Sequence, residues 1–268
     1  MPVISGADTI RVMDVTERFF SFSWISDTFK LPADAAGKDK RDMKEKGKRD
    51  LLSGIGLLCA FFLWTILIQF IDVQAAGPNG ATIGLATFNI RFHQLTGVHM
   101  TLYTITDWLG LVPIFICLCF GGLGIVQLIK RRSLLRVDTD LILLGVYYVL
   151  VIFCYLIFEM IPINYRPILI EGRLEASYPS STTLLVLSVM PTLKLQIERR
   201  SKSAAISGTV SIFVVLFSSF MVVGRLISGV HWATDIIGAV FFSLGLYLIY
   251  CFGVETLDRR REISHGFQ

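Results

Sequence analysis

One histidine and one aspartate near the C-terminal end of the chain have a spacing that suits proton transfer or nucleophilic chemistry. His231 and Asp235 are four residues apart, so a helix that begins there places both side chains on one face. The carboxylate can then accept a hydrogen bond from one imidazole N–H, which fixes the tautomer and leaves the other nitrogen free. A histidine oriented in this way is suited to nucleophilic attack or to proton transfer.

Two arginines and a run of hydroxyl residues extend this pair into a larger polar group. Arg225 precedes the histidine by six residues, and Arg166 lies in an earlier polar stretch, residues 163–167. Guanidinium groups present planar donor forks that match phosphate oxygens. Ser180 begins a run of hydroxyl residues, and backbone N–H groups at a helix start there would add neutral donors. These residue types together predict an oxyanion site suited to phosphoryl transfer.

The composition places these polar residues in a membrane protein. Of the 268 residues, 53% are hydrophobic and 17% are charged, and the mean hydropathy is +0.64. About a quarter of the residues in a soluble domain are charged, so this excess of apolar residues indicates contact with lipid. Runs close to the roughly 20 apolar residues that cross a bilayer predict six spans. They are Leu51–Ile71, Trp108–Ile129, Leu141–Ile161, Thr183–Ile197, Ala204–Val223 and Ile236–Gly253.

The positive charges give the six predicted spans an orientation. All but four of the 25 Lys and Arg residues precede the first span, follow the sixth, lie in the second-to-third connection, or lie in or near the fourth-to-fifth connection, where Lys194 is at the end of the fourth span. The positive-inside rule therefore places both termini in the cytoplasm. The other four, Arg91, Arg166, Arg173 and Arg225, fall on the outer side, where both polar stretches then lie. This distribution argues against nucleic acid as the partner that a pI near 8.8 would suggest.

Composition also divides the chain into three parts. We expect residues 1–50 to be a charged, poorly ordered cytoplasmic segment, residues 51–253 to form the membrane domain, and residues 254–268 to form a cytoplasmic tail. No cleavable secretory signal is visible before the first apolar run. Met43, at the start of a charged stretch, would make a natural translation start, with residues 1–42 as an upstream extension without a fixed fold.

The fourth predicted span and the long outer connection are the least regular parts of the membrane domain. The fourth span is short and contains Pro191 and Lys194, so either it starts earlier, near Ser180, or it is kinked at the proline. The outer connection covers Asp72–Asp107. Its second part, Phe88–Thr106, is expected to form a short helix on the membrane surface, which would make a lip over the polar group.

The remaining cysteines and histidines suggest neither a metal nor a cofactor. All five cysteines lie inside predicted spans, which supports neither a disulfide framework nor a zinc site. His93, His99 and His265 have no partner at a telling spacing and are expected to be surface or loop residues.

In these polar stretches the sequence resembles the type 2 phosphatidic acid phosphatase superfamily, membrane lipid phosphatases related in their core to vanadium haloperoxidases. That family has three motifs: lysine, six residues, Arg-Pro; then Pro-Ser-Gly-His; then Ser-Arg, five residues, His, three residues, Asp. The counterparts here are Arg166-Pro167, then Pro179-Ser180-Ser181-Thr182, then Gly224-Arg225, five residues, His231, three residues and Asp235. The resemblance covers the whole six-span body.

The resemblance implies an all-α bundle of six transmembrane helices and a metal-independent, cofactor-free hydrolysis of a lipid phosphate or pyrophosphate. His231 would accept the phosphoryl group as nucleophile, and Asp235 would orient it. Arg166, Arg225 and Ser180 would bind the phosphate. The reaction would take place at the outer face of a plasma membrane, the inner membrane of a bacterium.

Four positions depart from the family's motifs. They are Glu159 for the lysine, Ser181 for the glycine, Thr182 for the histidine and Gly224 for the serine. A threonine hydroxyl cannot protonate the leaving oxygen as that histidine does, and loss of a general acid typically costs about a hundredfold to ten-thousandfold in rate. A pyrophosphate would suffer less, because its leaving phosphate is already a stable anion. Glu159 removes a phosphate-binding cation, unless it points elsewhere or pairs with an arginine. Possible accessory residues are Ser181, Thr182, Glu159 and Tyr165.

Each of these residues also has a purely structural interpretation. Asp235 would cap its helix, the two arginines would be interfacial residues with snorkelling side chains, and residues 180–183 would be a helix cap and a packing surface. Two other functions stay open. Glu159 and Thr182 favour a weakly active or inactive relative that binds or moves lipid phosphates, and the spacing of His231 and Asp235 disfavours a purely structural membrane protein.

Overall fold

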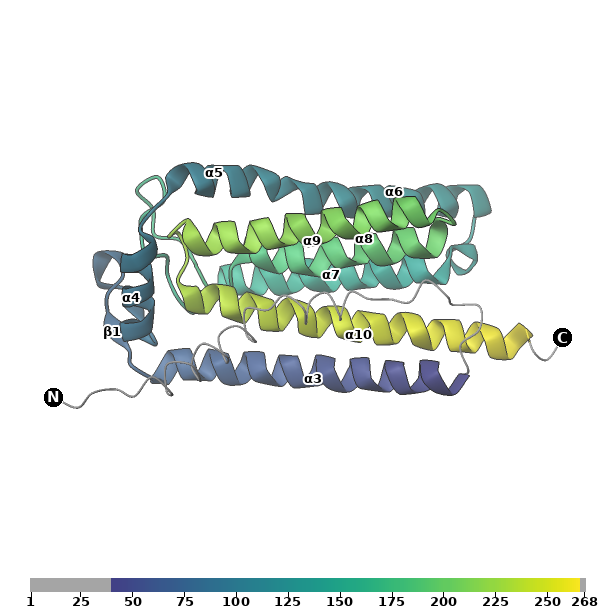
Figure 1. Cartoon of the computed structure of the whole chain (residues 1–268), viewed down its shortest axis with the longest axis horizontal. Coiled ribbons are helices and arrows are strands. Elements are labelled where there is room, and N and C mark those ends of the chain that lie inside the picture. The colour runs from purple at the N-terminus through teal and green to yellow at the C-terminus, as the bar shows by residue number, and fades with distance from the viewer. Residues whose placement is uncertain (1–39, 266–268) are drawn as a thin grey trace, which may run out of the picture. The chain divides into compact units, whose positions relative to one another are not determined.

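The computed structural model describes residues 40–265, with side-chain surroundings for residues 45–261, and most of these residues are helical. The long helices are α3 (Lys40–Phe70), α6 (Leu111–Arg131), α7 (Thr139–Met160), α8 (Ser181–Arg200), α9 (Ala204–Ile227) and α10 (Ala233–His265). The shorter elements are β1 (Gln74–Ala75), η1 (Pro78–Gly80), β2 (Thr82–Ile83), α4 (Ala86–Thr96), α5 (Met100–Leu109) and η2 (Leu134–Arg136). The long helices run side by side in one bundle (Figure 1).

The ends of the described chain differ in part from the predicted three-part division. Residues 1–39 and 266–268, which include most of the predicted N-terminal segment, lie outside the described residues. Residues 40–50 belong to α3, so the first helix begins well before the predicted span. The predicted cytoplasmic tail continues α10 as helix as far as His265. Charged helical turns therefore extend both of these helices beyond their apolar centres.

Five helical segments of the described residues are long and apolar enough to cross a membrane. They are Glu45–Phe70, Met100–Arg131, Thr139–Met160, Ala204–Ile227 and Ala233–Arg261. They correspond to the first, second, third, fifth and sixth predicted spans. The second is longer than predicted because α5 runs into α6 through Gly110, whose φ of −59° and ψ of −17° are helical.

The fourth predicted span is a helix, α8, but its composition alone does not make it a membrane span. It packs against α9 and α10 and also meets α6 and α7. Most residues from Thr183 to Gln196 are buried, including Ser188, Thr192 and Lys194. Since the surrounding helices cover α8, it does not need the apolar surface that lipid contact demands. Helix α8 begins at Ser181, which confirms the expected start near Ser180, and it continues through Pro191 to Arg200.

Close packing beneath the polar end of the bundle involves helices α3 and α10. A Cβ atom added to Gly54 would lie 3.0 Å from the carbonyl oxygen of Gly245, so side chains there would push the two helices apart. Nearer the polar end, the ring of Phe61 lies 4.6 Å from that of Phe242 and stacks on that of Tyr178 at 5.9 Å. This aromatic cluster supports the segment that leads into α8.

The predicted outer connection, Asp72–Asp107, contains a helix, α4, that crosses one end of the bundle (Figure 1). Helix α4 lies roughly across the long helices (Figure 1). Its Asn89 is fully buried: the amide Nδ2 donates to Thr234 Oγ1 at 3.0 Å, and Oδ1 accepts from the Thr234 N–H at 3.3 Å. The predicted helix over Phe88–Thr106 is therefore right in its first half only, because residues from Met100 belong to α5.

His93 on α4 was expected to be a surface residue without a partner, and this expectation is wrong. Its Nε2 lies 3.0 Å from the carbonyl oxygen of Gly229, and its ring centroid lies 5.6 Å from that of Trp232. Both partners belong to the connection between α9 and α10, which is distant in sequence from α4. His99 remains exposed, and its Nε2 contacts only the Thr96 carbonyl among the hydrogen bonds described for it.

Candidate active site

The candidate nucleophile lies in the short connection between α9 and α10. This turn requires a glycine at position 229, where φ is +70° and an added Cβ atom would lie 2.1 Å from the Gly97 carbonyl oxygen. The Ser228 carbonyl accepts a hydrogen bond from the His99 N–H at 3.0 Å. The segment between α4 and α5 therefore holds this turn in place, and His231 follows it at only 3% exposure.

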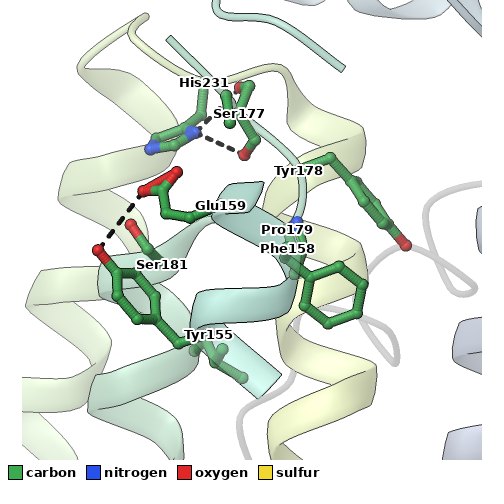
Figure 2. A pocket seen from close by; sticks show the side chains of 10 residues that line it. Tyr155, Phe158, Glu159, Ser177, Tyr178, Pro179, Ser181 and His231 are labelled. Atoms are coloured by element: carbon green, nitrogen blue, oxygen red, sulfur yellow. Dashed lines mark hydrogen bonds between the residues drawn. The ribbon is translucent and has the colours of Figure 1, made fainter. Parts of the chain in front are cut away.

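A serine hydroxyl lies between the histidine and the aspartate. His231 Nδ1 is 3.8 Å from Asp235 Oδ2, too far for the predicted direct hydrogen bond. Ser177 Oγ lies 3.1 Å from Nδ1 and donates a short hydrogen bond to Asp235 Oδ2. The predicted pair is thus a bridged triad, and Figure 2 shows Ser177 beside the imidazole. The i, i+4 spacing brings the two side chains to one place, but the loop before α8 inserts the bridging group.

The contacts of Nδ1 define the tautomer of His231. Nδ1 lies 3.1 Å from the Ser177 carbonyl oxygen, which can only accept, so Nδ1 carries the proton. Burial is the largest influence on the pKa of His231; with the positive charges of Arg166 and Arg225 it lowers that pKa to about 4, against an opposing effect of Asp235. The imidazole is therefore neutral at pH 7. Its Nε2 is buried and has no hydrogen-bond partner among the described residues.

Asp235 combines the two roles that the sequence left open. Its carboxylate is fully buried and accepts from Ser177 Oγ and from Asn164 Nδ2, the latter at 3.3 Å. The same carboxylate accepts from the backbone N–H of Trp232 at 2.9 Å, the residue that precedes α10. An acidic side chain in the first turn that reaches back to this N–H caps the helix. Capping and support of the histidine are thus one arrangement.

Two guanidinium groups lie next to one tyrosine ring near the histidine. The Cζ atoms of Arg225 and Arg166 lie 4.9 and 5.8 Å from the centroid of the Tyr103 ring, within cation–π range. Arg225 Nη2 pairs with Asp107 Oδ1 at 2.9 Å, and Arg166 Nε lies 3.1 Å from Glu175 Oε2. Helix α5, which supplies Tyr103 and Asp107, therefore helps to position both arginines.

Both guanidinium groups retain unused donors. Nε and Nη1 of Arg166 and of Arg225 are buried and have no hydrogen-bond partner in the part of the chain that the structure describes. Arg166 Nε is close enough to Glu175 for an ion pair, but it is not aligned for a hydrogen bond. Unsatisfied buried cationic donors are costly, so this arrangement favours binding of an anion with several acceptor oxygens.

The hydroxyl run at the start of α8 holds the site together more than it offers free donors. The Ser180 N–H donates to the Asp235 carbonyl oxygen at 3.2 Å, and its Oγ donates to Thr183 Oγ1 at 3.1 Å. The Thr182 hydroxyl accepts a short hydrogen bond from Arg225 Nη2. Ser180 therefore occupies the N-cap position of α8 without a side-chain capping hydrogen bond and links the start of α8 to Asp235, and Thr182 fixes a guanidinium group.

A pocket opens beside the histidine and contains a carboxylate. The pocket is partly open to the exterior. Its lining residues are Tyr155, Phe158, Glu159, Ala176, Ser177, Tyr178, Pro179, Ser181, Leu184 and His231. In Figure 2 the Glu159 carboxylate, at the end of α7, points toward the imidazole. Glu159 accepts from the Tyr155 hydroxyl at 3.5 Å, and the ion pairs described for the two arginines involve other acids.

Several residues of this site were not selected from the sequence. Ser177 and Asn164 lie within a few residues of the first two motifs, so the polarity of those stretches was a signal for both. Tyr103 gave no such signal, because it lies far from every motif. Tyr165, expected as an accessory residue, contributes its backbone carbonyl, which accepts from Trp232 Nε1 at 2.8 Å. The described residues include no group of three or more His, Cys, Asp or Glu side chains placed to hold a metal ion.

Comparison with solved structures identifies a similar fold. The chain is similar to the crystal structure of the first transmembrane PAP2 type phosphatidylglycerolphosphate phosphatase from Bacillus subtilis, with a TM-score of 0.53 and 16% sequence identity. The match covers 78% of this chain and 96% of that one. No protein-family model matches the sequence, and no curated protein does. The resemblance inferred from the motifs is therefore confirmed as a likeness of fold.

Proposed function

We propose that this protein hydrolyses a lipid phosphate or pyrophosphate through a phosphohistidine intermediate on His231. The observation that carries this proposal is the buried, unpartnered Nε2 of a neutral histidine near two arginines with unused N–H groups. The likeness of fold to a transmembrane phosphatase supports it. Substrates are expected to be phosphomonoesters or pyrophosphates whose apolar part stays in the membrane.

The first step is an in-line displacement at phosphorus. The Nε2 lone pair forms the N–P bond while the bond from phosphorus to the leaving oxygen breaks. Negative charge on the equatorial oxygens is stabilised by Arg166 and Arg225, because their donors are already oriented and buried. The positive charge that develops on the ring is stabilised through Nδ1–H by Ser177 and, behind it, Asp235. Water then breaks the N–P bond and releases phosphate.

The charge distribution supports a site on the outer face of a plasma membrane. The polar site lies where α8 and α10 begin, and the cationic ends of α6, α8 and α10 lie at the opposite end of the bundle (Figure 1). The positive-inside rule assigns that cationic end to the cytoplasm. Both termini can lie on the same side only if the number of crossings is even. The five candidate spans then need one more, and α8, enclosed by the other helices, would supply it.

An assay of the full-length protein in detergent tests this proposal. Purified protein would be offered the phosphates and pyrophosphates of diacylglycerol and of farnesol, and released phosphate would be measured. We expect His231→Ala to reduce hydrolysis to background, since removal of a covalent nucleophile costs about a millionfold in other hydrolases. Phosphate release that persists unchanged in His231→Ala would falsify the proposal.

A second candidate function is binding or movement of lipid phosphates with little or no turnover. Thr182 favours it, because the residue at the position of the family's general acid only accepts a hydrogen bond from Arg225. The same assay distinguishes the two functions. Saturable binding of the lipid phosphates without phosphate release, together with a large gain of activity in Thr182→His, would favour this second function.

A further inference from the structure

We propose that Glu159 is the proton-transfer residue of this site, in place of the histidine that is absent at position 182. This inference rests on the proposed phosphatase function and concerns the same pocket. Hydrolysis of a phosphomonoester releases an alcohol, so the leaving oxygen needs a proton, and Thr182 cannot supply one. A carboxylic acid is a common general acid in such chemistry.

The geometry of the pocket places Glu159 on the side of the histidine that is available for reaction. Nδ1 of His231 faces Ser177, so the ring presents its unpartnered Nε2 elsewhere. Glu159 and His231 line one pocket, and the carboxylate points toward the ring (Figure 2). A phosphoryl group attacked by Nε2 would have its leaving oxygen on the far side of phosphorus, and a carboxyl group on a nearby wall can reach such an oxygen.

The other acids near the site are already engaged. Asp235 is fully buried and accepts three hydrogen bonds. Asp107 and Glu175 pair with the two arginines. Glu159 is the one carboxyl group among the described residues that line the pocket, and its only described hydrogen bond, from Tyr155, is long at 3.5 Å. It is therefore free to exchange protons with a substrate and with water.

Repulsion between a carboxylate and a phosphate does not oppose this role. A nearby anion favours the neutral, protonated form of a carboxylic acid. A carboxylic acid can donate a hydrogen bond to a phosphate oxygen, so the acid form of this side chain is compatible with a bound phosphate. Arg166 and Arg225 keep the site attractive for the phosphate itself.

The proton balance closes over both steps. In the first, the Nε2–P bond forms, the P–O bond to the lipid breaks, and the Glu159 proton passes to the leaving oxygen, so the lipid departs as an alcohol. In the second, the Glu159 carboxylate takes a proton from the attacking water. The new P–O bond forms as the N–P bond breaks, its electron pair returns to Nε2, and phosphate leaves with Glu159 protonated again.

The test compares Glu159→Gln with the native protein on matched lipids. Cleavage of phosphatidic acid releases diacylglycerol, an alcohol whose oxygen needs a proton. Cleavage of diacylglycerol pyrophosphate releases phosphatidate, a stable anion that needs no proton. We expect Glu159→Gln to lower kcat on phosphatidic acid by about a hundredfold to ten-thousandfold, and on the pyrophosphate by less than about tenfold. The ratio of the rate on phosphatidic acid to the rate on the pyrophosphate should therefore fall by at least about tenfold in the variant.

Glu171→Gln is the matched control, because it removes an exposed carboxylate from the loop that follows α7, away from the pocket. It should leave both rates and their ratio unchanged. Equal losses on the two lipids in Glu159→Gln, or no loss on either, would overturn the role of Glu159 while His231-dependent hydrolysis stood. Absence of any His231-dependent hydrolysis would instead overturn the proposed function and this inference with it.

Discussion

The two ends of the bundle use the same kinds of charged residue in opposite ways. At the end away from the site, Arg199 forms two hydrogen bonds with Asp258, at 2.6 and 2.8 Å, and the two side chains are 23% and 32% exposed. At the site end, Arg225 is 2% exposed while its partner Asp107 is 56% exposed. In the first pair, cation and anion are exposed to similar degrees. The second leaves a buried cation with donors that its partner does not use.

This difference separates charges that hold helices together from charges that are available to a ligand. Partly exposed ion pairs such as Arg199–Asp258 contribute little to stability, typically about 0.2–1 kcal/mol each. A buried guanidinium group with unused donors has a desolvation cost that an anionic ligand can offset. Paired Arg and Lys residues alone would not distinguish the two ends, whereas the unequal burial of the partners does.

The largest expected effect is the difference between removing an arginine at the site end and removing one at the opposite end. Arg225→Ala should lower kcat/KM for lipid phosphates by about a hundredfold to a thousandfold, the usual cost of one oriented donor at a developing anion. Arg199→Ala should leave kcat/KM nearly unchanged and lower only the thermal stability slightly. Steady-state kinetics and a thermal melt of both variants test this contrast, and similar kinetic losses at both ends would contradict it.

A smaller effect is expected from the hydroxyl that bridges the histidine and the aspartate. Ser177→Ala removes the link from His231 Nδ1 to Asp235 but leaves the Ser177 backbone carbonyl in place. We expect kcat to fall by about tenfold to a hundredfold, the worth of one hydrogen bond to a charged group, with KM little changed. A rise of KM at constant kcat would indicate a role in substrate binding instead.

Replacement of the tyrosine between the arginines should have a weaker effect. Tyr103→Leu removes the aromatic face, and cation–π contacts contribute about 0.5–2 kcal/mol, so KM should rise by about twofold to thirtyfold. Tyr103→Phe keeps the ring and should behave like the native protein. Equal KM values in the two variants would show that the ring face does not position Arg166 and Arg225.

The smallest expected effect is the response to moderate acid. Attack requires the neutral imidazole, and burial together with the nearby arginines lowers the pKa of His231 to about 4. Protonation of His231 should therefore leave kcat/KM nearly constant between pH 7 and about 5 and reduce it about tenfold per unit below about pH 4. An acid limb with its midpoint near pH 6.5, the ordinary histidine value, would show that the site is not desolvated in solution.

The sequence predicted what depends on local spacing and missed what depends on distant contacts. His231 and Asp235 follow from one turn of helix, and Arg225 lies in the same motif. Ser177 meets them only because the loop before α8 folds back onto α10, more than 50 residues away along the chain. Tyr103 reaches the arginines from α5, and no motif extends to that helix.

The fold was predictable where lipid contact determines composition. Helices that face lipid need apolar surfaces, and five such segments among the described residues match predicted spans. Helix α8 is enclosed by other helices, so its composition follows the rules of a protein interior, and hydropathy indicates its proposed membrane crossing less clearly than the other five. The helical turns of α3 before Leu51 are charged, and apolar length could not detect them.

The enclosed helix α8 has a consequence for how the protein is made. In the proposed topology, buried Lys194 and Gln196 make α8 a poor candidate for independent insertion, since isolated polar groups are costly in hydrocarbon. The helices that shelter it most, α9 and α10, are synthesised after it. Insertion of α8 must therefore be delayed until those helices arrive. Because the candidate site lies where α8 and α10 begin, a chain that stalls before this last step would lack the assembled site that we propose to bind phosphate.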